Sequence, residues 1–265
     1  MSADDRIERA AQFFWADRLA RRRYRNLPPE LRPRTIAETY AAQEALQALI
    51  GGRLGAVAGY KIALTSPAMR HLLRVDEPFA AAIFADTVHA SPAAVRAGDF
   101  VSLGIECELA VRLDRDLPAA GAPYDRATVA EAVGACMAAF ELVDDRNADY
   151  GALDVPSCIA DNGWNAGVVL GPPHAGWRAL DLAGAAGRLE INGRPAGSGK
   201  AGDVMGHPFE ALAWLANFHA GRGRGLTRGA IVMTGSIVQT LHLAPGDRAT
   251  FSFDGLDAVA LDVSS

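Results

Sequence analysis

Two N-terminal segments carry apolar residues at helical spacing. In residues 4–25 the apolar positions between Ile7 and Leu19 fall three or four residues apart, which predicts a helix that ends at the prolines after Asn26. A second helix is predicted over residues 35–50, closed by two glycines. We therefore expect residues 1–52 to form a helical N-terminal segment.

After this segment the pattern becomes that of a β-rich unit over residues 53–265. Ser66 and Pro67 have the residue types of an N-cap and a first helical position, so they predict a short helix to about residue 74. Further helices are expected over the alanine-rich residues 126–140 and over 208–220. Strands are expected over residues 60–65, 105–113, 168–170 and 231–234, with hairpins over 188–196 and 250–263.

Strands and helices do not alternate regularly, and hairpins dominate the last third of the chain. This order predicts an α+β fold with a mixed, twisted sheet rather than a doubly wound parallel sheet.

Composition and charge exclude several classes of protein. The chain has 265 residues, of which half are apolar, and a formal net charge of −5, so a nucleic-acid partner is not expected. No apolar run approaches the roughly 20 residues that cross a bilayer, and the acidic start does not resemble a signal peptide. The three widely spaced cysteines have neither disulfide-framework nor zinc-ligand spacing. We expect a cytoplasmic protein with no membrane partner.

Two glutamates stand close together on one predicted strand. Glu106 and Glu108 are two residues apart, so in a strand their side chains point to the same face. Such carboxylates repel each other unless solvent or a cation intervenes, and hard divalent cations prefer oxygen ligands. The pair is therefore either the solvated face of an edge strand or part of a metal site.

A third carboxylate lies inside an apolar run. Glu141 interrupts the apolar residues 137–143, and a buried glutamate is costly unless it is paired or bound to a metal. The alternative is a helix-to-strand junction at which Glu141 reaches water. Together with Glu106 and Glu108 it would form a three-carboxylate site for Mg²⁺, with positions left for water and substrate.

Short segments along nearly the whole chain resemble one protein family. The chain is similar to the hydratase and decarboxylase branch of the fumarylacetoacetate hydrolase superfamily. The matching segments, in chain order, are A-E-T-Y-A-A-Q (37–43), G-Y-K-I-A-L-T-S (59–66), E-C-E-L-A (106–110), F-E-L-V-D-D-R (140–146), A-D-N (160–162), G-H-P (206–208), A-W-L-A-N (213–217) and M-T-G-S (233–236).

The resemblance implies a mixed β-fold with a short helical N-terminal part, usually assembled as a ring-like homo-oligomer. It also implies a Mg²⁺ or Mn²⁺ site at Glu106, Glu108 and Glu141. The implied activity is that of a hydro-lyase, which adds water to 2-hydroxy-dienoates, small 2-oxo acids from the breakdown of aromatic compounds. The alternatives are a 2-oxo-3-enedioate decarboxylase, or a non-catalytic partner subunit of such a lyase.

Some positions depart from the hydratase pattern. Hydratases of this branch commonly carry an aspartate after the proline that here precedes Phe79. Its proton-transfer role is then vacant or falls to Asp76, Glu77 or Asp86, of which we name Asp86 as the candidate. Decarboxylases of the branch lack that aspartate too. In contrast, the T-G-S of residues 234–236 is typical of hydratases, since decarboxylases usually have T-G-G.

The remaining candidate residues follow from the same segments. Lys61 lies on the strand face opposite Ile62, where it would stabilise an enolate oxygen or relay a proton; otherwise it is an exposed strand lysine. Asn162 and Ser236 are candidate substrate-binding residues, or else ordinary turn residues. A carbon–carbon hydrolase of the wider superfamily would need a histidine–glutamate pair that acts as a general base on water, for which His71 and Glu77 are the candidates.

The glycine-rich residues 197–202 fit the spacing G-x-G-x-x-G, but a predicted hairpin precedes them instead of a βαβ strand. Nucleotide binding is therefore not expected there.

Overall fold

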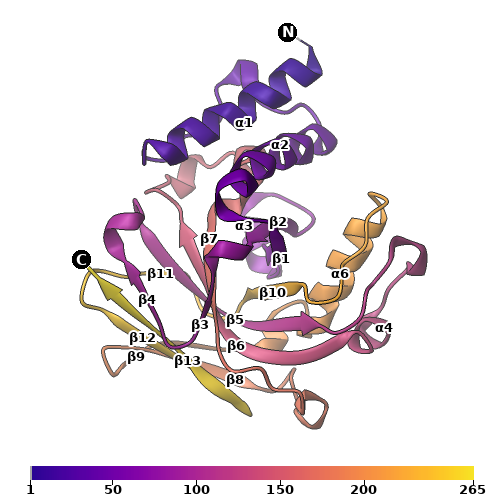
Figure 1. The fold of residues 1–265 in the computed structure, drawn as a ribbon, viewed down its shortest axis with the longest axis vertical. Coiled ribbons are helices and arrows are strands. Elements are labelled where there is room, and N and C mark those ends of the chain that lie inside the picture. The colour runs from indigo at the N-terminus through magenta and orange to yellow at the C-terminus, as the bar shows by residue number, and fades with distance from the viewer. Residues whose placement is uncertain (1) are drawn as a thin grey trace.

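The computed structural model describes residues 2–265, in which the N-terminal helices lie at one end, and the helices of residues 126–130 and 208–220 lie beside the strands (Figure 1). The helices are α1 (Ala3–Leu19), α2 (Ile36–Leu54), α3 (Pro67–Leu73), α4 (Arg126–Ala130), α5 (Val155–Ala160) and α6 (Pro208–Ala220). The strands are β1 (Val57–Ala63), β2 (Phe79–Phe84), β3 (Val88–Ala90), β4 (Ala93–Arg96), β5 (Leu103–Leu113), β6 (Val133–Asp144), β7 (Asn165–Leu170), β8 (Ala186–Ile191), β9 (Arg194–Lys200), β10 (Ile231–Ser236), β11 (Leu241–His242), β12 (Arg248–Phe253) and β13 (Leu256–Ser264).

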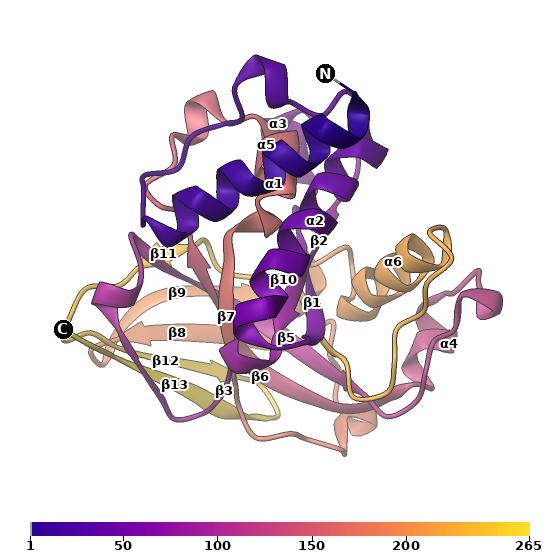
Figure 2. The same ribbon diagram turned by 45° about the horizontal axis from the view of Figure 1, so that its top comes forward.

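The strands form two mixed sheets. The larger has the order β2-β1-β10-β5-β6-β7-β3, with β11 paired to β5, and the smaller has the order β4-β13-β12-β8-β9. The pairs β1–β10, β3–β7 and β4–β13 are parallel, whereas the hairpins β5–β6, β8–β9 and β12–β13 are antiparallel. The long strands β5 and β6 form the middle of the larger sheet, and Figure 2 shows them passing beneath the helices.

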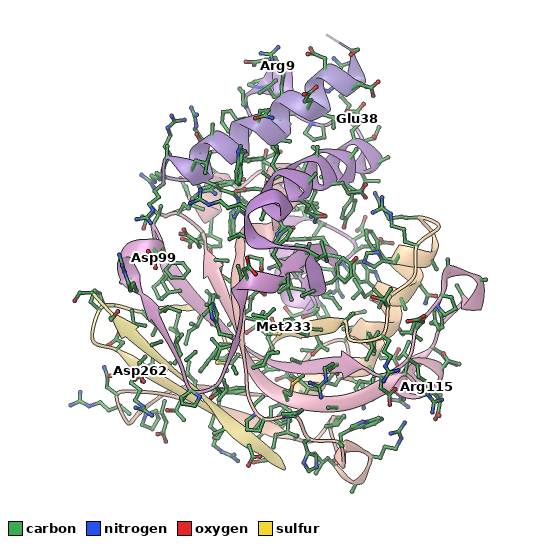
Figure 3. The ribbon with its side chains drawn as sticks, in the orientation of Figure 1. Arg9, Glu38, Asp99, Arg115, Met233 and Asp262 are labelled. Atoms are coloured by element: carbon green, nitrogen blue, oxygen red, sulfur yellow. The ribbon has the colours of Figure 1, made fainter. Side chains whose placement is uncertain are left out.

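The two faces of the larger sheet have different surroundings. On one face Cys107, Leu109, Phe140 and Leu142 join the main apolar core, which includes residues of the smaller sheet such as Phe251. The opposite face carries a small, separate apolar cluster that includes Met233, which Figure 3 shows near the middle of the molecule. Polar side chains can therefore gather on this second face without entering the main core.

The N-terminal helices cover one edge of the larger sheet. Thr35 caps α2 by accepting a hydrogen bond from the Glu38 amide, and the buried residues Tyr40 and Leu46 of α2 pack in an apolar cluster with Phe84 of β2 and residues of α5. The buried amide of Gln43 donates to the carbonyls of Ala80 and Ile159, so it ties α2 to both β2 and α5. These contacts fix the wall beside β1 and β2. The division into residues 1–52 and 53–265 stays a prediction.

The observed fold confirms the α+β class with a mixed sheet, and the hairpin turns lie at Asn192–Gly193 and between β12 and β13 as expected. The first predicted helix is shorter than expected, ending at Leu19. The helix predicted over 126–140 is wrong: α4 spans Arg126–Ala130, and β6 begins at Val133. Nearly every residue of β6 is buried, so its apolar residues do not alternate with polar ones, and alanine content alone misled the prediction. Within residues 2–265, every helix is too short or too polar to span a bilayer.

Candidate metal centre

The antiparallel register of β5 and β6 brings the three predicted carboxylates together. Glu106 lies directly opposite Glu141, and Glu108 lies opposite Ala139, so all three glutamate side chains emerge on one face. One carboxylate oxygen from each of these residues lies within 4.8 Å of those of the other two. The sequence-based prediction that they form one cluster therefore agrees with the geometry.

Two of these carboxylates are fully buried. The backbone N–H of Gly235 donates to Oε2 of Glu108 at 2.7 Å, and the Asn165 amide donates to Oε1 of Glu141 at 3.0 Å. The other oxygen of each, Oε1 of Glu108 and Oε2 of Glu141, has no hydrogen-bond partner among the described residues. A buried, unpartnered carboxylate oxygen is costly, so these two atoms suggest a ligand that the protein itself does not supply.

The proximity of the carboxylates also changes their protonation. Burial raises the pKa of Glu108 well above its usual range, and the negative charges of Glu141 and Glu106 raise it further. Burial raises the pKa of Glu141 as well, and the ammonium of Lys61 opposes this effect, leaving the pKa at about 7. Without a cation the cluster therefore retains protons near neutral pH.

Glu106 is less buried than its two neighbours and lies toward the open side of the cluster. The hydroxyl of Thr240 donates to its Oε1 at 2.6 Å, which orients the carboxylate from the segment that leads into β11.

Lys61 joins the cluster from a distant strand. Its Nζ lies 3.1 Å from Oε1 of Glu141, and the lysine is 3% exposed. In the sheet order, β10 and β5 lie between β1 and β6, which would separate the two backbones by about 14 Å in a flat sheet. The sheet must therefore curl around this face. Burial alone would lower the pKa of Lys61, but the charges of Glu141 and Glu106 outweigh it and raise this pKa.

Phe79 and Gly163 hold the lysine in place. The Nζ of Lys61 lies 5.7 Å from the ring centroid of Phe79, within reach of a cation–π interaction. A Cβ on Gly163 would lie 2.9 Å from Cε of Lys61 and 2.8 Å from Cε2 of Phe79, and the φ of Gly163 is +54°. Glycine is required here because the backbone passes directly against the lysine.

The apolar cluster that contains Met233 extends the same face of the sheet. Met233 is the register partner of both Lys61 and Ala110, and Ala110 is one same-face step from Glu108. The cluster also includes Ile83, Met137, Ala139 and Val168. The charged groups therefore lie next to a buried apolar surface. This surface lowers the local dielectric constant and strengthens the interactions of the charged groups with a bound ion.

Asn162 and Ser236 lie near the cluster but are engaged with the protein. The buried Asn162 accepts from the Ala82 amide and from Gln47, and its own amide donates to the Ala82 carbonyl. The Ser236 hydroxyl donates to the Val238 carbonyl and accepts from the Cys107 amide. Each side chain fixes a wall of the site: Asn162 holds the turn before Gly163, and Ser236 holds the segment after β10 against β5.

Asp86 is not brought to the cluster. It is exposed in the short turn after β2, and its carboxylate lies next to Gly55, before the start of β1, whereas Lys61 lies near the end of that strand. The other two candidates for the same role, Asp76 and Glu77, are also exposed. The side chain in this region that does reach Lys61 is Phe79.

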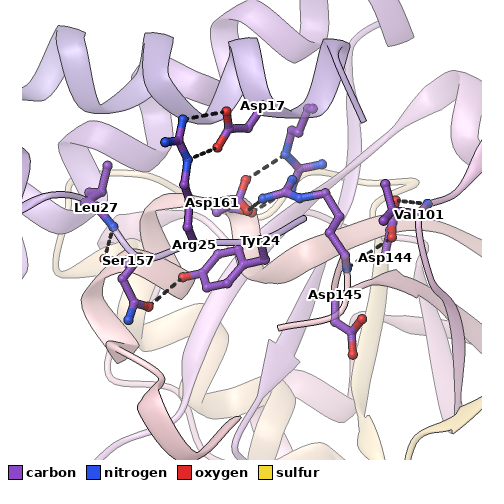
Figure 4. A network of polar contacts seen from close by, with 12 residues as sticks. Asp17, Tyr24, Arg25, Leu27, Val101, Asp144, Asp145, Ser157 and Asp161 are labelled. Carbon is purple, nitrogen blue, oxygen red and sulfur yellow. Dashed lines mark hydrogen bonds and ion pairs between the residues drawn. The ribbon is translucent and has the colours of Figure 1, made fainter. Parts of the chain in front are cut away.

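The A-D-N segment has a further structural role through Asp161. This fully buried carboxylate accepts hydrogen bonds from Arg18 of α1 at 2.7 Å and from Arg146 at 2.5 Å (Figure 4). Two arginines compensate its charge, so α1 is clamped to the turn that carries Asn162 and Gly163. This pairing accounts for the arginine that ends the segment over 140–146.

Sequence analysis missed several residues of the site. Thr240 and Asn165 orient Glu106 and Glu141, but a lone threonine or asparagine carries no recognisable spacing signal. Gly163 had a weak signal, since it directly follows the A-D-N segment, and Gly235 lies within the M-T-G-S segment but was not named as a site residue. Gly235 has a φ of +120°, and a Cβ there would lie 2.3 Å from Oγ1 of Thr65.

The site has the donor set of a hard divalent cation. It offers carboxylate oxygens from three glutamates. One buried oxygen of Glu108 and one of Glu141 have no hydrogen-bond partner in the described chain, and the net charge of the three carboxylates and the one ammonium is negative. Mg²⁺ and Mn²⁺ fit such oxygen ligands better than softer, sulfur-seeking metals.

Comparisons with known proteins agree with this geometry. Residues 66–264 match the family described as fumarylacetoacetate (FAA) hydrolase C-terminal. The chain is 33% identical over 208 residues to 2-hydroxyhexa-2,4-dienoate hydratase of Comamonas testosteroni, covering 77% of each chain. It is 31% identical to 2-keto-4-pentenoate hydratase of Paraburkholderia phymatum over the full length of both.

A solved structure of similar fold is 4-oxalocrotonate decarboxylase from Pseudomonas putida G7, complexed with magnesium and adipate. It has a TM-score of 0.92 at 24% identity and covers 99% of each chain. Given the match over residues 66–264 and the full-length relative, this chain belongs to the fumarylacetoacetate hydrolase family.

Proposed function

We propose that this protein is a divalent-cation-dependent hydro-lyase that adds water to a 2-hydroxy-dienoate, as the names of its hydratase relatives describe. One observation carries the proposal: two buried carboxylate oxygens without partners in the described chain face a third carboxylate and a buried lysine. The expected cation is Mg²⁺ or Mn²⁺, held by Glu106, Glu108 and Glu141. The substrate is a small 2-oxo acid in its enol form.

The proposed chemistry divides between the cation and the protein. When bound, the cation would act as a Lewis acid toward the oxygens at the carboxylate end of the substrate. The carboxylates around Lys61 favour its charged form, and this ammonium would stabilise negative charge on the enolate oxygen. The apolar floor around Met233 excludes water from the oxygen end. Asn162 and Ser236 hold in place the backbone segments that surround the site, through their hydrogen bonds to Ala82 and Cys107.

The overall reaction has two steps. A proton adds to the far carbon of the dienol as the enol oxygen becomes a ketone, which leaves a conjugated alkene. Water then adds to that alkene. The dienolate that is protonated in the first step and the enolate that water addition generates in the second step both carry negative charge on the same oxygen, so one fixed cluster can assist both.

A second candidate is a 2-oxo-3-enedioate decarboxylase of the same family. Phe79 favours it, because an apolar ring lies against Lys61 where the hydratase pattern has a proton-transferring aspartate. Loss of CO₂ leaves electrons on the same enolate, so the cluster suits this reaction too.

The first experiment follows the absorbance of 2-hydroxypenta-2,4-dienoate with Mg²⁺ and after treatment with EDTA. 2-Oxohex-3-enedioate is assayed in parallel for CO₂ release. Cation-dependent loss of the dienoate is the expected result. Release of CO₂ from the diacid without turnover of the dienoate would replace the proposed function by the second candidate, and no reaction with either compound would contradict both.

We further propose that the protein is a cytoplasmic homo-oligomer, as the family resemblance implies. Light scattering coupled to gel filtration gives the mass in solution, and a monomer mass would contradict the oligomer.

A further inference from the structure

An open cleft lies beside the carboxylate cluster. It has a volume of about 450 Å³, and its lining includes Arg23, Asp145, Tyr150 and His242. His242 pairs with Gly104 in the β11–β5 ladder, and Gly104 is one same-face step from Glu106. The hydrogen bond from Thr240, two residues before His242, to Glu106 confirms that these side chains share a face.

The imidazole of His242 lies over a glycine. A Cβ on Gly104 would come within 3.1 Å of Cγ2 of Thr240 and 3.7 Å of Cδ2 of His242, so a larger residue would crowd the ring. Two residues along a strand span about 7 Å, so the imidazole over Gly104 lies roughly this far along the strand from Glu106.

A buried carboxylate orients this imidazole. Nε2 of His242 lies 3.0 Å from Oδ2 of Asp145, which is 2% exposed. The Tyr150 hydroxyl donates to the same oxygen, and the Asn147 amide donates to Oδ1. Burial and the charge of Asp145 raise the pKa of Tyr150, so its hydroxyl remains a donor. Because Oδ2 of the carboxylate is an acceptor, Nε2 carries the proton and Nδ1 is the basic nitrogen.

The position of His242 suits the far end of the substrate. A five-carbon chain held at its carboxylate end places its last carbon about 5 Å away. Lys61 and Glu108 lie at the deep end of the cluster, whereas Glu106 leads toward Gly104 and the cleft. A substrate that enters through the cleft therefore brings its far carbon toward the imidazole, which is 48% exposed to the cleft.

We propose that His242, positioned by Asp145, is the catalytic residue that transfers protons at the far end of the substrate, while Lys61 remains at the oxygen end. This inference rests on the proposed function. The enol proton leaves to solvent when the substrate binds. Nδ1 takes up a proton from solvent, so that the ring beside Asp145 is an imidazolium. Its Nδ1–H bond then breaks as a C–H bond forms at the far carbon, the double bonds shift by one position, and the oxygen becomes a ketone.

The neutral imidazole left by that step serves the second step. Water attacks the carbon next to the far carbon, its O–H bond breaks as the C–O bond forms, and Nδ1 of His242 takes the proton. The electron pair of the alkene returns to the oxygen beside Lys61 as an enolate, which solvent protonates at carbon. The charged and titratable groups that line this cleft with the imidazole are Asp145, Tyr150 and Arg23, and Glu106 is two residues from Gly104, the ladder partner of His242.

The test compares wild type with His242→Gln, His242→Ala and Asp145→Asn. Turnover of 2-hydroxypenta-2,4-dienoate is measured with Mg²⁺ across pH, deuterium incorporation at the far carbon is measured in D₂O, and Mg²⁺ affinity is measured by calorimetry. We expect His242→Gln to lose at least about 100-fold in kcat, the range of general acid–base catalysis, while Mg²⁺ affinity and Tm stay unchanged. Deuterium incorporation should fall equally, and the alkaline limb of the pH profile, which reflects loss of the imidazolium proton, should disappear.

Two further variants distinguish chemistry from structure. Added imidazole should restore part of the activity of His242→Ala, because the cleft is open to solvent, and Asp145→Asn should lower kcat with little change in KM. His174→Gln, near the opposite end of β6, serves as the matched control and should behave as wild type. If wild type turns over the dienoate and His242→Gln keeps its kcat within about threefold with an unchanged pH profile, the role of His242 is wrong and the proposed function stands. If wild type shows no turnover, the proposed function itself fails, and the role of His242 fails with it.

Discussion

Glu106 and Glu141 stand directly opposite each other across β5 and β6, so one pair of the antiparallel ladder consists of two carboxylates on the same face. Like charges in such a pair are destabilising, and Glu108 adds a third within 4.8 Å. Against these three, Lys61 supplies one positive charge, which leaves −2 when every group is ionised. A divalent cation matches that charge, and in its absence protons on Glu108 and Glu141 relieve it.

The first prediction concerns how much the Glu108 carboxylate destabilises the folded protein when no cation is bound. Glu108→Gln removes one of three crowded charges, while its remaining oxygen can still accept from the Gly235 amide. In EDTA we expect its Tm to rise by about 2–5 °C, which corresponds to roughly 1–2 kcal/mol for a chain of this size. Wild type should gain Tm on addition of Mg²⁺, and the variant should not. Differential scanning fluorimetry with and without Mg²⁺ measures both effects.

A suitable control is the exposed Glu190→Gln on β8, which should respond to Mg²⁺ as wild type does. A Glu108→Gln protein that retains the full cation-induced gain would show that Glu108 is not a ligand.

The second prediction concerns the lysine. Lys61→Met leaves Glu141 buried without its cationic partner, and breaking a buried ion pair in this way costs about 3–5 kcal/mol. We expect this loss in the free energy of unfolding at pH 8 in EDTA. The deficit should shrink as the pH falls from 8 toward 7 and level off below 7, because Glu141 is then protonated in both proteins and no longer needs the ammonium. Urea unfolding at pH 8 and pH 6 measures the difference.

The chain provides its own control, since its other lysine, Lys200, is exposed on β9. Lys200→Met should unfold as wild type does at both pH values. An equal deficit for Lys61→Met at both pH values would mean that lost packing, and not an uncompensated carboxylate, explains the effect.

The sequence predicted the parts of the site that depend on local period. Glu106 and Glu108 share a face because strand side chains alternate, and Glu141 was recognisable as a carboxylate within an apolar run. The register that places Glu141 opposite Glu106 is a tertiary property. It depends on β6 being a strand, and the alanine-rich residues before Glu141 suggested a helix. In a strand buried on both faces, the periodicity that separates the two structures is absent.

The walls of the site could not be predicted in the same way. Asp86 was chosen for its residue type and its place after the Lys61 strand, but the antiparallel pairing of β1 and β2 carries it to the other end of that strand. Asn162 looked available for a ligand, yet backbone groups of β2 and the Gln47 amide occupy it. The glycines over 197–202 fit the spacing G-x-G-x-x-G without its sequence context, and two of them make room for Ile237 and Val238 after Ser236. These outcomes depend on contacts between segments far apart in the sequence.

The third prediction tests the contact between Gly163 and Lys61. Gly163→Ala introduces a Cβ within 3 Å of Lys61 and Phe79 at a positive φ. We expect a loss of about 1–3 kcal/mol in stability, and a kcat at least about tenfold lower as the ammonium is displaced, with Mg²⁺ affinity retained. Unfolding, steady-state kinetics and calorimetry measure the three quantities.

Gly223→Ala separates the effect of backbone strain at a positive φ from the effect of steric contact with Lys61. Gly223 has a φ of +71°, but no neighbouring atom lies within 4 Å of the position that a Cβ would take, so this variant carries the backbone strain without the contact. It should lose stability and keep its kcat. If both variants have wild-type kcat, the position of Lys61 does not depend on Gly163.

The last prediction uses a histidine outside the site. His219 of α6 is 5% exposed, packs against the ring of Tyr60 at 4.3 Å between centroids, and has no hydrogen-bond partner for either ring nitrogen within residues 2–265. Burial lowers its pKa to about 4, and the charges of Arg224 and Arg222 act in the same direction. The folded protein therefore keeps this imidazole neutral well below pH 6.5.

In the unfolded chain the same histidine takes up a proton near pH 6.5, so the unfolded state binds more protons than the folded state between about pH 6.5 and pH 4. The free energy of unfolding must then decrease as the pH falls through this window, by at most roughly 3 kcal/mol from this group, and the contribution is fully present above pH 6.5. His219→Gln should remove that part of the slope, whereas His71→Gln, at an exposed position of α3, should keep it. Urea titrations at half-unit steps of pH compare the slopes. Parallel curves for wild type and His219→Gln would mean that the imidazole is solvated or paired in the folded protein.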